Sequence, residues 1–99
     1  MSNNPVLSRL GFARKAGRLS LGFSASKEAI ALNKARLIII ANDISPKTEK
    51  EIIYFANGRC PVRKIAFDLE TVSRSICFRA GVIAVNDDGF ATTILNNLP

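Results

Sequence analysis

The chain has 99 residues, of which 47% are hydrophobic, and a formal net charge of +6; this length and apolar content predict one domain over residues 1–99. Histidine is absent, which removes the usual general base and the commonest metal ligand, and the longest aliphatic run, residues 37–41, is too short to cross a bilayer. We therefore predict a soluble, cytoplasmic protein that is not an enzyme and that needs no metal, cofactor or small-molecule substrate.

The first predicted elements are a helix and a short strand. Residues 1–5 lack the basic start and the apolar stretch of a signal peptide, and Pro5 instead favours the first turn of a helix. The apolar stripe of this helix has a helical spacing and stops at Gly17. Residues 18–22 then alternate polar and apolar side chains, which is typical of a short strand.

A second helix and a buried strand are predicted next. Ser24 or Ser26 would cap the helix, which runs to about Leu32, and Asn33 suits the left-handed turn that ends it. Residues 35–41 contain a continuous run of large aliphatic side chains, most of them β-branched. Such a run is typical of a strand that is covered on both faces.

The Ser-Pro pair at positions 45 and 46 predicts the start of a third helix, with Ser45 as the cap and Pro46 in the first turn. This helix is expected to end near Asn57 and Gly58. Its inward-facing apolar residues would be Ile52, Ile53, Phe55 and Ala56. Residues 61–67 are predicted to form another strand.

The last third of the chain continues the same alternation. Asp68 is expected to cap a short helix that runs to about Cys77, residues 81–85 form a strand, and Asp87 or Asp88 caps a final helix. Helices and strands therefore alternate throughout. This order predicts the α/β class, as a three-layer α/β/α sandwich whose central mixed sheet has about four strands.

All of the net charge lies in the first 36 residues, which hold seven basic side chains and one acidic one, whereas residues 37–99 hold seven of each. Such a concentration predicts an anionic partner, with nucleic acid as the leading choice and an acidic membrane surface as the competing one. The turn over residues 22–26 offers a glycine, two hydroxyls and the N–H groups of a helix N-terminus, which suit a phosphate. Lys27 would stand beside those N–H groups. Three more cations could border the same edge: Arg14, Lys15 and Arg18.

Several patterns that could carry chemistry have simpler explanations. Residues 22–26 are close to the Gly-x-Ser-x-Gly elbow of hydrolases, but that elbow needs a histidine. The Ser-x-x-Lys match at residues 24–27 lacks the other motifs of its class, and a helix cap followed by a surface lysine explains both patterns. Cys60 and Cys77 have no motif spacing and are expected to be free, buried thiols. Four aspartates at strand ends are expected to cap helices or form turns: Asp43, Asp68, Asp87 and Asp88.

Five stretches of the chain form a recognisable pattern, in order and with compatible spacing. They are Gly11–Gly17, Gly22, Lys34–Asp43 with Pro46, Cys60–Val62 and Gly81–Ala91. Together they resemble the bacterial, YlxQ-like branch of the ribosomal protein L7Ae family, and the resemblance covers nearly the whole chain. It implies one RNA-binding domain with the L30e-like α/β/α sandwich, which agrees with the predicted layout.

The best-known family members bind kink-turn RNA through the motif Gly-x-Asn-Glu-x-x-Lys at the start of the second helix. In this chain Gly22 matches, but Ser24, Ala25 and Glu28 stand at the Asn, Glu and Lys positions. Ala25 cannot accept hydrogen bonds from guanine N–H groups, and Glu28 presents the wrong charge to phosphates. The resemblance therefore implies RNA binding mainly through shape and phosphates, with base readout weakened.

The resemblance implies two further contact regions. One is the loop before the last strand, where Cys77 replaces a common glycine and Arg74 and Arg79 add positive charge. The other is Ile44, which matches an apolar position that packs against RNA in family members and which would equally well close over the third helix. The complete candidate RNA-binding set is Arg14, Lys15, Arg18, Gly22, Phe23, Ser24, Ala25, Ser26, Lys27, Lys34, Ile44, Arg74 and Arg79.

The leading hypothesis is a non-catalytic, ribosomal or ribosome-associated module that recognises structured, kink-turn-like RNA. Its partners would be ribosomal or other non-coding RNA and ribonucleoprotein components, and not a membrane. The alternative is a protein-interaction module on the same fold that has lost specific RNA readout, with exposed Phe23 and Phe78 as contacts. A small hydrolase that uses Ser24 is a third hypothesis, against which the absence of histidine argues.

Overall fold

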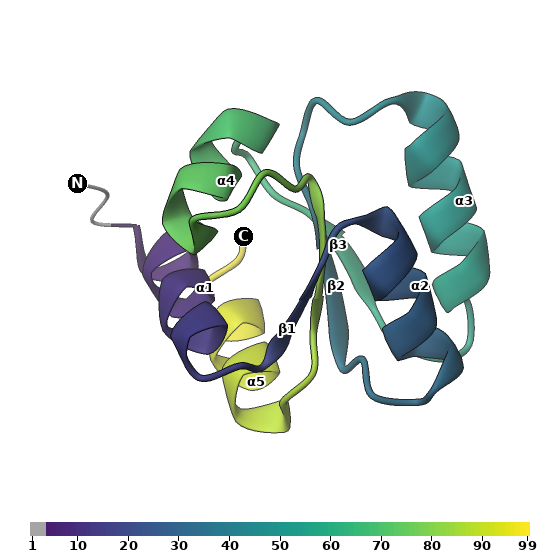
Figure 1. Ribbon diagram of the computed structural model, residues 1–99, viewed down its shortest axis with the longest axis horizontal. Helices are drawn as coiled ribbons and strands as arrows, with labels where there is room; N and C mark the ends of the chain where they lie inside the picture. Colours follow the sequence, from purple (N-terminus) through teal and green to yellow (C-terminus); the bar gives the residue numbers. More distant parts are fainter. Residues whose placement is uncertain (1–3) are drawn as a thin grey trace.

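A four-stranded mixed sheet separates two layers of helices (Figure 1). The computed structural model describes residues 4–99, and within them the elements follow in the order α1 (Pro5–Lys15), β1 (Leu19–Leu21), α2 (Phe23–Ala31), β2 (Leu37–Ile40), α3 (Pro46–Ala56), β3 (Val62–Lys64), α4 (Leu69–Ile76), β4 (Val82–Val85) and α5 (Asp88–Asn96). The strand order is β1-β4-β2-β3, with β4 antiparallel to both neighbours and β2 parallel to β3. The predicted three-layer α/β/α sandwich is confirmed. The prediction that these first residues are not a signal peptide concerns residues 1–5, and residues 1–3 lie outside the described part.

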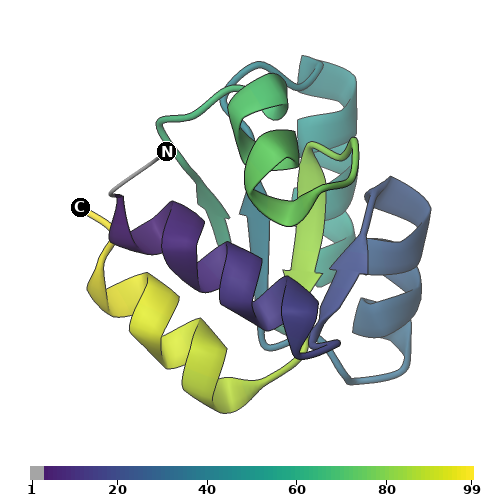
Figure 2. The same ribbon diagram turned by 60° about the vertical axis from the view of Figure 1, so that its left-hand side comes forward.

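The two central strands supply both hydrophobic cores. Every residue of β2 and of β4 is buried, as the aliphatic run predicted for β2. Leu37 and Ile39 belong to the core beneath α1, α4 and α5, whereas Ile38 and Ile40 belong to the core beneath α2 and α3. Successive residues of a strand point to opposite faces, so four consecutive aliphatic residues stabilise both layers at once. Figure 2 shows α1 lying between α4 and α5 on the first of these faces.

Three of the predicted helix caps are confirmed. Ser45, Asp68 and Asp87 each accept a hydrogen bond from the backbone N–H three residues further along, at 3.2, 2.8 and 2.9 Å. The last helix is thus capped by Asp87 and not by Asp88, which is its first residue. Asn33 has the left-handed φ of 58° that was predicted for the turn after the second helix. These side chains satisfy N–H groups that a helix start would otherwise leave without a partner.

The second helix, by contrast, begins without a side-chain cap. Its N-cap is Gly22, whose φ of 97° is readily adopted only by glycine, and its first residue is Phe23. Ser24 is exposed in the first turn, whereas Ser26 is fully buried and its hydroxyl has no hydrogen-bond partner among the described residues. The prediction that Ser24 or Ser26 caps α2 is therefore wrong. The turn at Gly22 takes the chain directly from β1 into α2, so the helix starts before either serine.

Both edge strands are shorter than predicted. β1 and β3 have three residues each, in place of the predicted segments 18–22 and 61–67. β3 pairs only with β2, and this pairing stops at Lys64, opposite the last residue of β2. An edge strand can extend only as far as its single neighbour offers hydrogen-bonding groups, so the length of β2 limits β3.

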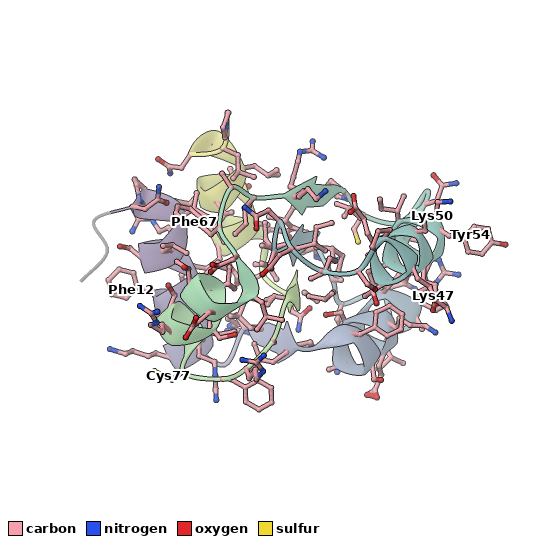
Figure 3. All side chains as sticks on the ribbon, turned by 90° about the horizontal axis from the view of Figure 1, so that it is seen from above. Phe12, Lys47, Lys50, Tyr54, Phe67 and Cys77 are labelled. Carbon is pink, nitrogen blue, oxygen red and sulfur yellow. The ribbon has the colours of Figure 1, made fainter. Side chains whose placement is uncertain are left out.

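The third helix buries a narrower face than predicted. Ile52 and Ala56 are fully buried and Phe55 is half-buried, but Ile53 is 45% exposed and Tyr54 is 84% exposed. The inward placement of Ile53 is therefore wrong. Adjacent residues are about 100° apart around a helix, so a side chain next to Ile52 leaves the face that packs against the sheet. Figure 3 shows Tyr54 pointing away from the body of the molecule.

Two aspartates hold the start of α4. Asp68 accepts a hydrogen bond from the Thr71 N–H, and Asp43 Oδ1 accepts one from the Leu69 N–H at 2.8 Å. Asp43 lies in the loop between β2 and α3, which is 26 residues away from Leu69 in the sequence. This bond therefore ties that loop to α4 and joins the two helical layers at one end of the sheet.

We expect the cap at Asp68 to make the stability of the fold pH-dependent. Hydrogen bonds from the Thr71 hydroxyl and from its backbone N–H hold the pKa of the Asp68 carboxyl below its ordinary value of 3.8. Because the pKa is lowered on folding, the cap contributes fully above pH 3.8, and its contribution is lost as the pH falls through the lowered pKa. Melting temperatures measured from neutral to strongly acidic pH should thus fall more for the natural chain than for Asp68→Asn, whose amide caps without titrating. Parallel curves for the two proteins would contradict this prediction.

Candidate nucleic-acid interface

Three segments meet at the upper end of the sheet in Figure 1. The Gly22 N–H donates to the Val82 carbonyl oxygen (2.8 Å), and the Ala41 N–H donates to the Gly81 carbonyl oxygen (2.9 Å). β1 and β2 thus both end beside the start of β4, because β4 runs antiparallel to each of them. We call this surface the loop end; it consists of residues 22–27, 41–45 and 77–81.

The start of α2 is open to an anion at the loop end. No side chain of the described residues caps this helix start, where Gly22 is the N-cap, and Ser24 and Ala25 are exposed. The first N–H groups of a helix have no partners within the helix, and the helix dipole adds positive potential at the same place. Together these features suit a phosphate group. Glu28, which is exposed one turn further along, opposes such an anion by its charge.

Lys27 is directed toward α3. Its ammonium nitrogen lies 5.3 Å from the centre of the Phe23 ring and 5.1 Å from the centre of the Phe55 ring. The guanidinium of Arg59 also lies over Phe55, at 5.7 Å. The attraction of a cation to an aromatic face explains this placement. Lys27 therefore lies in the contact between α2 and α3, and not beside the N–H groups as predicted.

The two loops of the loop end present different surfaces. Ile44 is half-buried and packs against both hydrophobic cores, so much of its side chain serves the fold. In the other loop, Arg79 is exposed and Phe78 is 49% exposed. The predicted pair of exposed aromatic residues is wrong for Phe23, which is half-buried and packs against the core beneath α2 and α3. Arg79 and Phe78 are thus the long side chains that this loop offers to a partner.

The cations of the first 36 residues do not form one cluster. Arg18 accepts a hydrogen bond on its carbonyl oxygen from the Asn86 N–H, and the Arg36 N–H donates to Val85, both at 2.8 Å. Arg18 and Lys34 therefore lie at the end of the sheet opposite to the loop end. A strand advances about 3.3 Å per residue, so β1 alone separates position 18 from position 22 by about 13 Å. The expectation that Arg18 borders the turn at residues 22–26 is wrong for this reason.

A third group of cations lies between two helices. Arg14 and Lys15 come from the last turn of α1, and Arg74 comes from α4; all three line a cavity between these helices. The candidate residues thus fall into three places: the loop end, the cavity between α1 and α4, and the opposite end of the sheet. Proximity in the sequence had suggested a single edge for most of them.

The contacts that fix the loop end could not be predicted from the sequence. Local sequence predicts only a turn or a cap for Asp43, because 26 residues separate it from Leu69, to which it is hydrogen-bonded. Arg59, whose guanidinium lies over the same Phe55 ring as the Lys27 ammonium, is not among the predicted site residues. Both contacts depend on how the elements pack, and no local motif marks them.

The described residues also bear on metal sites, membrane-spanning helices and disulfides. Within residues 4–99 no group of three or more histidine, cysteine, aspartate or glutamate side chains is placed to hold a metal ion. No helix in that same range is long and apolar enough to span a membrane. Cys60 and Cys77 are free thiols as predicted, and partial burial raises the pKa of Cys60 above its ordinary value of 9.0. The predicted burial is wrong for Cys77, which is exposed just beyond the end of α4.

Known proteins are similar to this chain in sequence and in fold. The model of the ribosomal protein L7Ae/L30e/S12e/Gadd45 family matches residues 5–92. Large ribosomal subunit protein eL30B of Schizosaccharomyces pombe is 34% identical over 92 residues, covering 89% of this chain and 78% of the relative. Large ribosomal subunit protein eL30 of Yarrowia lipolytica is 31% identical over 91 residues, covering 89% and 84%. A Bacillus halodurans protein of unknown function has a solved structure that superimposes with a TM-score of 0.89, at 25% identity, covering 95% of this chain and 96% of that one.

Proposed function

Since the chain belongs to the ribosomal protein L7Ae/L30e/S12e/Gadd45 family, we propose that it is a ribosomal or ribosome-associated protein that binds structured RNA at its loop end. The names of its eL30 relatives, which are proteins of the large ribosomal subunit, support this role. Membership in a family of ribosomal proteins also confirms the prediction that the chain is not an enzyme.

One observation carries the placement of RNA at the loop end. The uncapped start of α2 meets two exposed loops there, and Arg79 adds a cation to the same edge. Backbone N–H groups and a cation bind phosphates without reading a sequence. An open helix start beside a basic loop suits the folded backbone of a structured RNA better than a flat single strand, because structured RNA is recognised largely by shape.

The RNA would be of the kink-turn type, bound with reduced specificity. Gly22 keeps the backbone turn of the family's contact motif, and its φ of 97° shows why glycine is needed there. Ser24 and Ala25 lack the amide and carboxylate that would hydrogen-bond guanine edges, and Glu28 repels phosphate. Affinity would therefore come chiefly from phosphates, and discrimination between a kink-turn and a plain duplex would be small.

A salt titration tests this function. Binding of a kink-turn RNA and of a duplex of equal length should both weaken steeply with added salt, since each phosphate contact contributes about 0.7–0.9 to the slope of log affinity against log salt. Arg79→Gln should lower that slope by roughly one such contact, whereas Lys34→Gln, at the opposite end of the sheet, should leave it unchanged. Absence of RNA binding at low salt would contradict the proposal, as would an equal decrease of the salt slope in Arg79→Gln and Lys34→Gln.

A further inference from the structure

A groove between α1 and α4 adjoins the loop end at Cys77, and the RNA site proposed above makes no use of its other lining residues. It is a cavity of about 810 Å³ whose walls come from α1 and from α4 with the residue that follows it. Figure 3 shows Phe12 of α1 and Cys77, just beyond α4, on the side of the molecule opposite to Tyr54. Exposed side chains of α1 and α4 line the groove, and both helices pack on the face of the sheet opposite to α2 and α3.

The floor of the groove is apolar and is formed where the two helices touch. A Cβ atom at Gly11 would lie 3.1 Å from the Ser75 carbonyl oxygen, so glycine allows this close approach. Leu7 and Ile76 contribute side chains to the lining that are 3% and 0% exposed. Gly11 and Ser75 both line the groove, so its floor lies where the two helices touch.

The rim of the groove carries a large apolar side chain that is more than half exposed. Phe12 is 54% exposed, and it lines the groove from the α1 side. Covering an exposed phenylalanine with another apolar side chain removes apolar surface from water and so favours binding. An exposed phenylalanine beside an apolar trough is therefore the kind of anchor on which a protein partner gains most of its affinity.

The charges of the groove are all positive. Arg14 and Lys15 of α1 and Arg74 of α4 line it, and no acidic residue is among the described residues of its lining. Arg74 has one ion pair, with Glu70 at 3.7 Å, but both side chains are more than 70% exposed. Such exposed pairs contribute little, so a partner carboxylate can replace this one at small cost.

We propose that this groove binds an acidic amphipathic helix of a protein partner. The part of α1 that lines it, residues 7–15, extends over about 12 Å at 1.5 Å per residue, which matches two turns of a docked helix. Apolar side chains at positions i, i+4 and i+7 of the partner would lie in the trough against Phe12 and Ile76. Flanking glutamates or aspartates would face the three cations. RNA fits less well, because phosphate and ribose leave the apolar floor without matching groups.

Two synthetic helical peptides provide the probe, and no RNA is needed. Both carry the same leucines at i, i+4 and i+7, but one has glutamate and the other lysine at the flanking positions. Fluorescence anisotropy with the full chain should show that the glutamate peptide binds at least about tenfold more tightly than the lysine peptide. Phe12→Ala and Arg74→Gln should each lower the affinity for the glutamate peptide by about five- to tenfold, whereas Tyr54→Ala on α3 should leave it unchanged.

Phe12→Ala and Arg74→Gln change exposed side chains, and melting curves of the free proteins verify that both variants fold. Equal affinity for the two peptides would overturn the proposal, because the cations would then have no part in recognition. No binding of either peptide would overturn it as well. If Phe12→Ala and Arg74→Gln weakened the binding of structured RNA and left the binding of the glutamate peptide unchanged, the groove would belong to the RNA interface. Peptide binding that persists in a chain without RNA affinity would separate this site from the proposed function.

Discussion

A variant that combines Ser24→Asn, Ala25→Glu and Glu28→Lys is expected to bind kink-turn RNA about 100-fold or more tightly than the natural chain. The first two changes restore groups that accept or donate hydrogen bonds at guanine edges, and a good contact of this kind contributes about 1–3 kcal/mol. Glu28→Lys replaces repulsion of a phosphate with attraction. All three side chains are exposed on α2, so the substitutions leave both hydrophobic cores intact.

The gain should be specific to the kink. A duplex of equal length lacks the splayed guanine edges, so its affinity should rise only through the added charge, by about tenfold or less. Filter binding or calorimetry at one fixed salt concentration gives both affinities. A matched variant with Glu28→Lys alone separates the charge effect from base readout. Equal gains for kink-turn and duplex in the triple variant would show that the start of α2 does not reach the guanines.

Gly81→Ala is expected to destabilise the fold by about 1–3 kcal/mol, the usual cost of an extra methyl group in a packed site. A Cβ atom at this buried position would lie 2.7 Å from Ile44 Cγ2 and 3.0 Å from Leu69 Cδ1. Ile44 would have to move, and it packs against both cores. For a domain of this size the melting temperature should fall by about 4–8 °C per kcal/mol.

A double-mutant cycle identifies Ile44 as the cause. Ile44→Ala removes the methyl group that would clash. Gly81→Ala should therefore lower the free energy of unfolding by less in the Ile44→Ala variant than in the natural chain, with a coupling energy of about 0.5–3 kcal/mol. Urea unfolding of the four proteins gives the required free energies. Additive effects of the two substitutions would contradict the proposed contact. The result also bears on RNA binding, because any movement of Ile44 alters the loop end.

Local features of the fold could be predicted from the sequence because local chemistry decides them. Ser45 caps α3 because a hydroxyl before Pro46 meets N–H groups only three residues away. β2 is buried on both faces because four consecutive aliphatic residues leave neither face polar. Asn33 adopts the left-handed turn because few other residues do so readily.

Other local predictions failed where packing overrides preference. Ser24 and Ser26 are good helix caps, but the turn at Gly22 starts α2 before them and places Ser26 against the core. Ile53 is as apolar as its buried neighbour Ile52, yet only one of them can face the sheet. Hydrophobicity identifies candidates for burial, and the orientation of the helix decides between them.

The sequence by itself determined the amount and sign of the charge, the order of the elements and the sites of most turns. Only the tertiary structure decided which side chains share a surface. Arg18 and Gly22 are neighbours in the sequence, but an extended strand holds them at opposite ends of the sheet. Gly22 and Arg79 are distant in the sequence, but the antiparallel pairing of β1 with β4 brings their segments to one end. Likewise, α1 and α4 form a groove because Gly11 lets two distant helices touch.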